Sequence, residues 1–177
     1  MDVQEEIRKL IKTIPHFPKE GVQFKDITPL LESPALSRAI TVEIARLFQG
    51  VNIDAVAGIE SRGFLYGLPL ATELNVPFIP VRKKGKLPDE TVAVKYLLEY
   101  GSEELEVHRR SIKKDMNVLI HDDLLATGGT ANAAASLVEM LGAKVAGFSF
   151  IIELNHLSGK KQLADYDKPI ISLVKYD

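Results

Sequence analysis

Apolar and polar positions follow a helical period twice in the N-terminal part of the chain. Apolar residues recur at helical spacing over residues 3–14 and stop before Pro15, which predicts a short amphipathic helix. Residues 33–48 repeat this spacing behind a Ser-Pro start, and Gly50 can end the second helix. The intervening residues 16–26 are too apolar for a solvated loop and too irregular for a helix. We therefore expect this stretch to cover another part of the molecule.

After Gly50, continuous apolar runs alternate with helical patterns. Such runs suit the strands of a parallel sheet whose two faces are both covered. The alternation predicts an α/β fold, doubly wound, with a mainly parallel sheet and helices on both faces. We expect a single domain over residues 1–177, with an N-terminal arm over residues 1–34. The expected strands are residues 54–59, 77–82, 117–121, 146–154 and 170–174, and the expected helices are residues 62–74 and 130–141.

Residues 83–110 interrupt this alternation. Residues 91–98 alternate like one arm of a β-hairpin, but charged residues crowd around them. A charged excursion of this length from a compact fold is more often a functional flap than a packing element. We therefore expect a flap over residues 83–110. The charged residues are Lys83, Lys84, Lys86, Glu99, Glu103, Glu104 and Glu106.

Composition and charge narrow the class of protein. Apolar residues make up 46% of the 177 residues and charged residues 26%, which is the balance of a globular domain. The chain has no cysteine, which excludes disulfides and thiolate metal sites, and we expect a cytoplasmic location. We expect no export signal and no membrane span, because the start is acidic and no apolar run is long enough. With a net charge of -2, we expect a small phosphorylated ligand at a local basic site and no nucleic-acid partner.

The strongest chemical signal is the run VLIHDDLLATGGT at residues 118–130. Gly128 and Gly129 let the backbone turn its amides toward an anion and approach it closely. Thr127 and Thr130 add hydroxyl donors at the N-terminus of the next helix, where the partial charge is positive. This part of the run predicts a cradle for a monophosphate.

Two adjacent acids precede this cradle. The carboxylates of Asp122 and Asp123 can accept hydrogen bonds from two hydroxyls, such as the vicinal diol of a ribose. Together with the cradle they predict a ribose 5-phosphate site at the carboxyl ends of parallel strands. The magnesium-binding strand of P-loop enzymes also ends in acids, but the required Gly-x-x-x-x-Gly-Lys-[Ser/Thr] loop is missing here. A glycine pair before a helix is by itself often only a tight turn.

The whole run resembles the signature by which type I phosphoribosyltransferases bind phosphoribosyl pyrophosphate (PRPP). That signature is an apolar strand, two acids, small residues and Thr-Gly-Gly-Thr, and the Leu-Leu-Ala at residues 124–126 is similar to the adenine-specific branch. The resemblance implies purine salvage by transfer of the 5-phosphoribosyl group of PRPP to adenine, giving AMP and pyrophosphate. It extends from about residue 15 to the C-terminus. The other blocks that carry it are residues 17–21, 24–29, 58–64, 82–88 and 98–101.

The resemblance also implies which residues hold PRPP. Mg²⁺ is the implied cofactor, bound mainly through PRPP, pyrophosphate and water. Basic side chains are needed in addition, because the diphosphate carries several negative charges. The alternatives are that Arg62 is a solvated first-turn arginine and that the lysines form a solvated turn. The Glu60–Ser61 peptide is expected to be strained or cis. The ribose 5-phosphate residues are Asp122, Asp123, Ala126, Thr127, Gly128, Gly129 and Thr130, and the pyrophosphate residues are Ser61, Arg62, Arg82, Lys83 and Lys86.

Adenine is expected under a segment that resembles the hood of the family. Phe24 offers a ring for stacking, and backbone groups at Gln23 and Lys25 would read the amino-bearing edge of the base. A carbonyl that accepts from the adenine amine would meet a carbonyl of hypoxanthine, which disfavours that base. Leu124 is expected to close the other face of adenine. The alternative for Phe24 and Leu124 is plain core packing.

The flap is expected to carry the catalytic group. Glu99 would exchange the proton that adenine loses from its imidazole edge, and Tyr100 would help to seal the site. The alternative for Glu99 is a solvated side chain on a mobile loop. The family resemblance also implies a homodimer, with the basic turn at residues 82–86 near the interface.

Three residues depart from the family pattern. His121 stands where an aliphatic residue is usual, and Gln23 and Lys25 stand where an aliphatic residue and an arginine are expected. A histidine beside Asp122 could be a catalytic base, but a core histidine with one satisfied nitrogen is the favoured interpretation. Two other functions stay open: another nucleobase phosphoribosyltransferase with a changed hood, and a non-catalytic PRPP-sensing regulator. A regulator that binds nucleic acid should carry a basic face or an added domain, and the sequence has neither.

Overall fold

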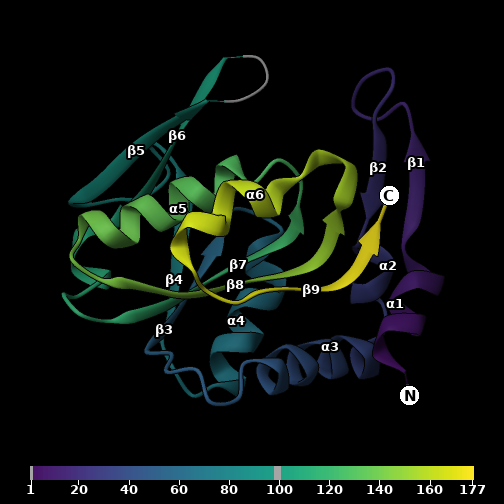
Figure 1. The fold of residues 1–177 in the computed structure, drawn as a ribbon, viewed down its shortest axis with the longest axis horizontal. Helices are drawn as coiled ribbons and strands as arrows, with labels where there is room; N and C mark the ends of the chain where they lie inside the picture. The colour runs from purple at the N-terminus through teal and green to yellow at the C-terminus, as the bar shows by residue number, and fades with distance from the viewer. Residues whose placement is uncertain (1, 98–100) are drawn as a thin grey trace.

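The computed structural model describes residues 2–97 and 101–177, and in them a central sheet has the strand order β5-β6-β4-β3-β7-β8-β9 (Figure 1). Five neighbouring strands, from β4 to β9, run parallel, whereas β6 is antiparallel to β4 and to β5. The predicted mainly parallel sheet is therefore confirmed. The strands are β3 Ala55–Ile59, β4 Phe78–Lys83, β5 Thr91–Leu97, β6 Ser102–His108, β7 Asn117–Leu125, β8 Lys144–Leu154 and β9 Ile170–Tyr176.

Helices cover both faces of this sheet (Figure 1). One hydrophobic core lies between the sheet and α5, and the other lies between the sheet and α1 to α4. Consecutive residues of β7 serve opposite cores, with Leu119 in one and Ile120 in the other, which explains the continuous apolar run. The helices are α1 Val3–Leu10, α2 Thr28–Leu31, α3 Pro34–Leu47, α4 Gly63–Glu73, α5 Gly129–Met140 and α6 Gly159–Leu163, with 3₁₀ turns at Arg109–Ser111, Asn155–Leu157 and Ala164–Tyr166. None of the helices in the described residues is long and apolar enough to cross a membrane.

The N-terminal arm differs from the prediction. The helix expected over residues 3–14 ends at Leu10, and the following residues form β1, Lys12–Pro15. β1 pairs antiparallel with β2, Gln23–Asp26, with Ile14 opposite Phe24. The prediction of helix beyond Leu10 was wrong because the apolar spacing there fits a helix or a strand, and the residue before a proline favours extended backbone. This β1–β2 hairpin contains the segment expected to form the hood, and we call it the hood; it stands apart from the sheet beside the C-terminus (Figure 1).

Two segments of the central sheet also differ from expectation. β7 continues past His121 to Leu125 because β8 pairs with it as far as Leu125–Glu153, so the two acids lie inside the strand. The base of the flap belongs to the sheet: β6 pairs with β4, and its Leu105 and Val107 are buried. The flap segment is therefore a packing element at its base, and the hairpin formed by β5 and β6 projects from it (Figure 1).

Three glycines let α4 lie close to the sheet. A Cβ at Gly58 would lie 2.5 Å from the Phe78 ring, and one at Gly67 would lie 2.9 Å from the same ring. At the start of α4, a Cβ on Gly63 would lie 3.0 Å from Oδ1 of Asp122. These close approaches place the loop before α4 directly beside the acids of β7.

Candidate active site

Most of the predicted site residues that the structure describes line two adjoining cavities at the carboxyl ends of β3, β4 and β7. The larger cavity, of about 520 Å³, is lined by the hood, the loop after β3, the flap hairpin, β7 and the start of α5. The smaller one, of about 60 Å³, is formed by the loop between β7 and α5 and shares two residues with it, Asp122 and Thr130. The larger is lined by Phe24, Glu60, Ser61, Arg62, Lys83, Tyr96, Glu103, Asp122, Asp123 and Thr130.

The smaller cavity lies where the sequence predicts the phosphate cradle, and we call it the cradle. Gly128 has a φ of +89°, a left-handed conformation that turns the chain into α5, and it is buried. The cradle is lined by Leu124, Leu125, Ala126, Thr127, Gly128, Thr130, Ala131, Asp122 and Phe150, so it includes most residues expected to hold the ribose 5-phosphate. Gly129 begins α5 at its edge, so the helix N-terminus adds partial positive charge.

Sequence reasoning missed the support of this cradle by α6. A Cβ at Gly128 would lie 2.6 Å from the carbonyl oxygen of Gly159, and a Cβ at Gly159 would clash with the carbonyl oxygen of Ala126. Lys160, the next residue of α6, forms an ion pair of 3.0 Å with the buried Glu153 at the end of β8. The Ser158-Gly159 pair at the start of α6 is the sequence signal for this close contact. Nothing nearby in the sequence indicates what Gly159 packs against.

Arg62 joins the acids of β7 to the hood. Its Nε lies 3.0 Å from Oδ2 of Asp123, and its guanidinium carbon lies 4.9 Å from the centre of the Phe24 ring. Burial raises the pKa of both Asp122 and Asp123; the charge of Asp123 adds to the rise at Asp122, whereas Arg62 opposes the rise at Asp123. Sugar hydroxyls fit this pair, because a carboxylate accepts hydrogen bonds and a protonated carboxyl also donates one.

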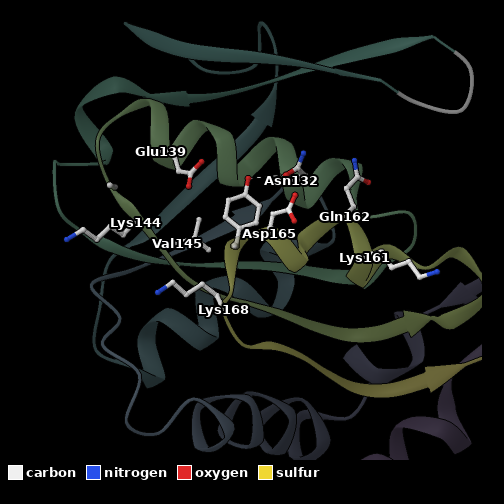
Figure 2. A pocket seen from close by; sticks show the side chains of 10 residues that line it. Asn132, Glu139, Lys144, Val145, Lys161, Gln162, Asp165 and Lys168 are labelled. Carbon is white, nitrogen blue, oxygen red and sulfur yellow. Dashed lines mark hydrogen bonds between the residues drawn. The ribbon is translucent and has the colours of Figure 1, made fainter.

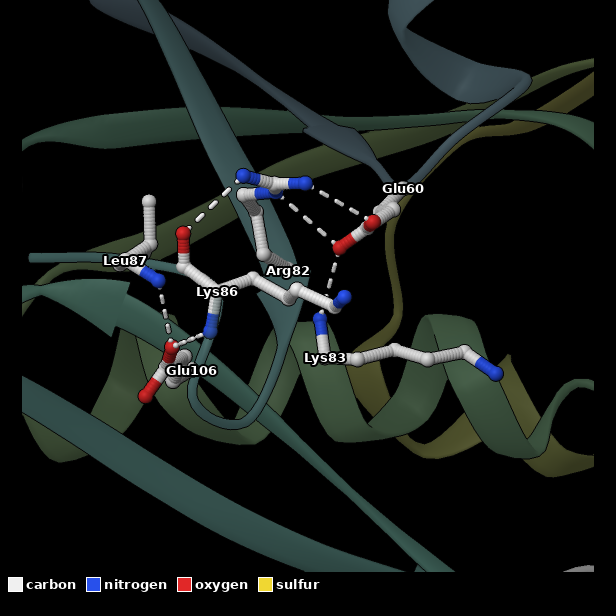
Figure 3. A network of polar contacts seen from close by, with 6 residues as sticks. All are labelled: Glu60, Arg82, Lys83, Lys86, Leu87 and Glu106. Carbon is white, nitrogen blue, oxygen red and sulfur yellow. Dashed lines mark hydrogen bonds and ion pairs between the residues drawn. The ribbon is translucent and has the colours of Figure 1, made fainter.

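The basic turn after β4, residues 82–86, is held by the carboxylates of Glu60 and Glu106 (Figure 3). Arg82 donates from Nε and Nη2 to the two oxygens of Glu60, at 3.1 and 3.0 Å, and these bonds hold the pKa of Glu60 below its usual range. Lys83 lines the larger cavity, where its Nζ lies 2.8 Å from Oε1 of Glu103. Lys86 is exposed. Arg82 is thus engaged by Glu60, next to the Glu60–Ser61 peptide, which is cis as expected.

The hood directs one aromatic ring at the site. Phe24 lines the larger cavity and packs edge-on against Phe17, with ring centres 5.1 Å apart. Lys25 points elsewhere: its Nζ donates to Thr13 and lies 4.2 Å from the centre of the Tyr176 ring. Because side chains alternate along a strand, Gln23 shares the outer side of β2 with Lys25. Any contact of these two residues with a base in the cavity would therefore use backbone groups.

The flap contributes two residues that the sequence did not single out as site residues. Tyr96 of β5 and Glu103 of β6 line the larger cavity, and the Tyr96 hydroxyl donates to Oε2 of Glu103 at 3.0 Å. Burial raises the pKa of Tyr96. The alternation of apolar and polar residues along β5 could have indicated that Tyr96 faces one side of the flap. It could not have indicated that this side meets Lys83. Glu99 and Tyr100 lie outside the described residues, so their roles stay predictions.

His121 is a core residue. It is fully buried, its Nδ1 lies 2.8 Å from Oγ of Ser149, and it lines neither cavity. Burial lowers its pKa to about 4. These observations agree with the core interpretation and separate His121 from the acid–base chemistry of the site. Within the described residues, its Nε2 has no hydrogen-bond partner.

A larger hollow, of about 680 Å³, lies on the far side of α5 (Figure 2). It contains three lysines, but Lys161 points away from Lys144 and Lys168, and two acids, Glu139 and Asp165, stand among them. Its cations therefore do not converge on one ligand position. The two smaller cavities, where acids, cations and a helix N-terminus meet, form the better candidate site.

Metal-binding side chains do not cluster in the part of the chain that the structure describes. No group of three or more His, Cys, Asp or Glu residues there could hold a metal ion. Asp123 is already paired with Arg62.

Comparisons with known proteins agree with this geometry. Residues 26–176 match the family described as phosphoribosyl transferase domain, and the chain belongs to this family. The adenine phosphoribosyltransferase of Methanococcus maripaludis is 51% identical over 172 residues, which cover 97% of this chain and 99% of the relative. That of Clostridium beijerinckii is 49% identical over 177 residues, which cover 100% and 99%. Within the family, the chain therefore belongs with the adenine phosphoribosyltransferases.

Solved structures show the same fold. The adenine phosphoribosyltransferase of Thermoanaerobacter pseudethanolicus superposes with a TM-score of 0.94 at 47% identity, covering 98% of this chain and 99% of that one. The enzyme of Saccharomyces cerevisiae, in complex with an imino-altritol bisphosphate and adenine, superposes with a TM-score of 0.90 at 39% identity, covering 97% and 98%.

Proposed function

We propose that this protein transfers the 5-phosphoribosyl group of PRPP to adenine and releases AMP and pyrophosphate, as a purine salvage enzyme. The observation that carries the proposal is the meeting of four features in adjoining cavities. These are the phosphate cradle, the acid pair of β7, the cationic loops after β3 and β4, and the ring of the hood. Each feature matches one part of the substrates, and the family membership agrees with it.

PRPP would lie along the line that these features define. Its 5-phosphate would sit in the cradle at residues 126–130, and its ribose hydroxyls would meet Asp122 and Asp123. The pyrophosphate group would then extend toward Ser61, Arg62 and Lys83 in the larger cavity. Mg²⁺ would be held mainly by the phosphate oxygens and water, where its charge would help to neutralise the leaving pyrophosphate.

Adenine would enter between the hood and β7. Phe24 would stack on one face of the base, and Leu124, which lines the cradle, would close the other. In the reaction the bond from the anomeric carbon to pyrophosphate breaks, the bond to a ring nitrogen of adenine forms, and adenine gives up one proton. The protein positions the two reactants, and the flap above them keeps water from the electron-poor sugar carbon.

A panel of nucleobases tests this function. With PRPP and Mg²⁺, we expect conversion of adenine to AMP, and a kcat/KM at least about tenfold lower for hypoxanthine, guanine and orotate, because their edges leave a buried polar contact unpaired. Product formation would be measured by chromatography for each base. Comparable efficiency with hypoxanthine would contradict the specificity for adenine, and the absence of any nucleotide product would contradict the proposed activity.

We also propose a cytoplasmic homodimer. The cysteine-free composition is compatible with that location. The basic turn at residues 82–86 lies at the surface, where a second subunit could approach it. If the second subunit contacts this turn, dissociation of the dimer lowers the activity.

A further inference from the structure

The basic turn after β4 is anchored through its backbone by a buried carboxylate outside the cavities. Glu106 of β6 accepts at Oε1 from the backbone N–H groups of Lys86 and Leu87, at 3.0 and 2.9 Å (Figure 3). Its Oε2 accepts from the Thr91 hydroxyl at 3.2 Å. Glu106 is 4% exposed, and it lines neither cavity. It is therefore a buried acid whose hydrogen bonds hold a surface turn in place.

The same turn is held from its other side. Arg82 donates from Nη1 to the carbonyl oxygen of Lys86 at 3.0 Å, while its other nitrogens bind Glu60. Glu60 also accepts from the backbone N–H of Lys83 at 3.0 Å. Both polar backbone groups of Lys86 are thus fixed, the carbonyl by Arg82 and the N–H by Glu106.

Within the turn, the Lys86 N–H also donates to the carbonyl oxygen of Lys83 at 3.2 Å, but the middle of the turn is permissive. Gly85 has a φ of +83°, and a Cβ at this position would meet no atom within 4 Å, so local packing does not restrict the turn. Lys84 donates its backbone N–H to the carbonyl oxygen of Glu104 at 3.0 Å, and its side chain forms an ion pair of 2.6 Å with the Glu104 carboxylate, where both groups are partly exposed. Exposed ion pairs of this kind contribute little to positioning.

We propose that Glu106 is a positioning residue for the pyrophosphate part of the substrate. By fixing the backbone N–H groups of Lys86 and Leu87, it places Lys86 relative to the loop at Ser61 and Arg62, and it links the end of the basic turn to the base of the flap. The inference rests on the proposed function, because it assigns pyrophosphate to these cations. The ribose 5-phosphate and adenine positions lie on β7, α5 and the hood, so Glu106 does not affect them.

The test compares three substitutions on one strand. Glu106→Leu removes both acceptors, and Glu106→Gln keeps an oxygen for the two N–H groups and offers an amide to the Thr91 hydroxyl. Glu104→Leu is the matched control, because it removes a neighbouring carboxylate that binds the side chain of Lys84 and keeps the backbone bond between residues 84 and 104. The measurements are KM for PRPP, Kd for magnesium pyrophosphate and Kd for AMP, with thermal unfolding to show that each variant folds.

We expect Glu106→Leu to raise KM for PRPP and Kd for pyrophosphate at least about tenfold while Kd for AMP stays within about twofold. Glu106→Gln should restore values near wild type, and Glu104→Leu should change neither. Unchanged pyrophosphate affinity in Glu106→Leu would overturn the proposal. An equal loss of AMP and pyrophosphate affinity would do so too, because it would show a merely structural role.

If Glu106→Leu does not fold, Thr91→Val decides the question. It removes the donor to Oε2 alone, so a rise of about twofold to threefold in Kd for pyrophosphate with unchanged Kd for AMP supports the proposal, and no rise overturns it. Pyrophosphate binding is measured directly, so the inference is decided even if the wild-type protein forms no AMP from adenine. In that case only the proposed function fails, whereas a wild-type protein that does not bind pyrophosphate overturns the inference.

Discussion

Single residues of β7 carry opposite responses to burial. His121 has its pKa lowered to about 4, because the buried charged imidazole would lack solvation. The next residue, Asp122, has its pKa raised by the same burial. Burial within the covered sheet therefore favours the neutral forms of both His121 and Asp122.

The depressed pKa of His121 predicts a loss of stability in mild acid. In the unfolded chain this histidine takes up a proton near its ordinary pKa of 6.5, whereas the folded protein does not do so until about pH 4. The free energy of unfolding therefore falls as the pH drops below 6.5, by about 2 kcal/mol between about pH 7.5 and about pH 5. Asp122 does not produce this slope, because a raised carboxyl pKa weakens stability as the pH rises.

Urea unfolding of His121→Val at these two pH values would measure the effect. The wild-type protein should lose about 2 kcal/mol more than the variant on acidification. His156→Val is the matched control, because it makes the same substitution at an exposed position. Equal slopes in the wild type and His121→Val would show that this histidine titrates normally.

At the scale of elements, the loop between β7 and α5 divides its two glycines between different tasks. Gly128 adopts a left-handed conformation against the carbonyl of Gly159, so it serves the fold. A Cβ at Gly129 would meet only ordinary contacts, the nearest being the carbonyl oxygen of Leu97 at 3.6 Å, and Oγ1 of Thr127 would be 3.9 Å away. Packing therefore does not require a glycine at position 129, and we predict that Gly129 keeps the edge of the cradle open for a ligand.

Alanine at each position should separate the two tasks. Gly128→Ala should lower the free energy of unfolding by at least about 2 kcal/mol, through backbone strain and a clash with α6. Gly129→Ala should fold as the wild type does, because alanine suits the first turn of a helix, but it should raise KM for PRPP at least about tenfold. Chemical denaturation and steady-state kinetics would measure both. A stable Gly128→Ala protein would contradict the packing role, and an unchanged KM in Gly129→Ala would place the phosphate elsewhere.

At the scale of the whole molecule, the hood is tied to the far end of the chain. Lys25 of the hood and Arg8 of α1 both lie over the Tyr176 ring of β9, and Arg8 also donates to the carbonyl of Lys175. The hood and α1 are thus joined to the last strand, at the edge of the sheet opposite to the flap (Figure 1). The site lies between two hairpins that are anchored at different edges.

The homodimer is a prediction at this scale. Light scattering should give twice the chain mass of 19.6 kDa at assay concentrations, and dilution below the dimer dissociation constant should lower kcat/KM for PRPP if the turn at residues 82–86 acts near the interface. A monomer with full activity at assay concentration would contradict this expectation.

The sequence by itself determined the parts of this protein that depend on near neighbours along the chain. Continuous apolar runs indicated buried parallel strands, and the acids, threonines and glycines of residues 118–130 indicated a ribose 5-phosphate site before any contact was known. The order of charges and glycines also indicated a basic turn and a flap hairpin. All of these features rest on spacings of a few residues, which the local chemistry of the backbone controls.

Only the tertiary structure decided which distant groups meet. Three sets of contacts join segments that are far apart in sequence. Arg62 contacts both Phe24 and Asp123, Gly159 packs against the cradle, and Glu106 anchors the basic turn. The same holds for the hood, where a local helical pattern was replaced by pairing with β2. These contacts depend on the order of the strands in the sheet and on the close approach of α4 and α6. Side-chain periodicity reports which face of an element is buried, but not which partner covers it.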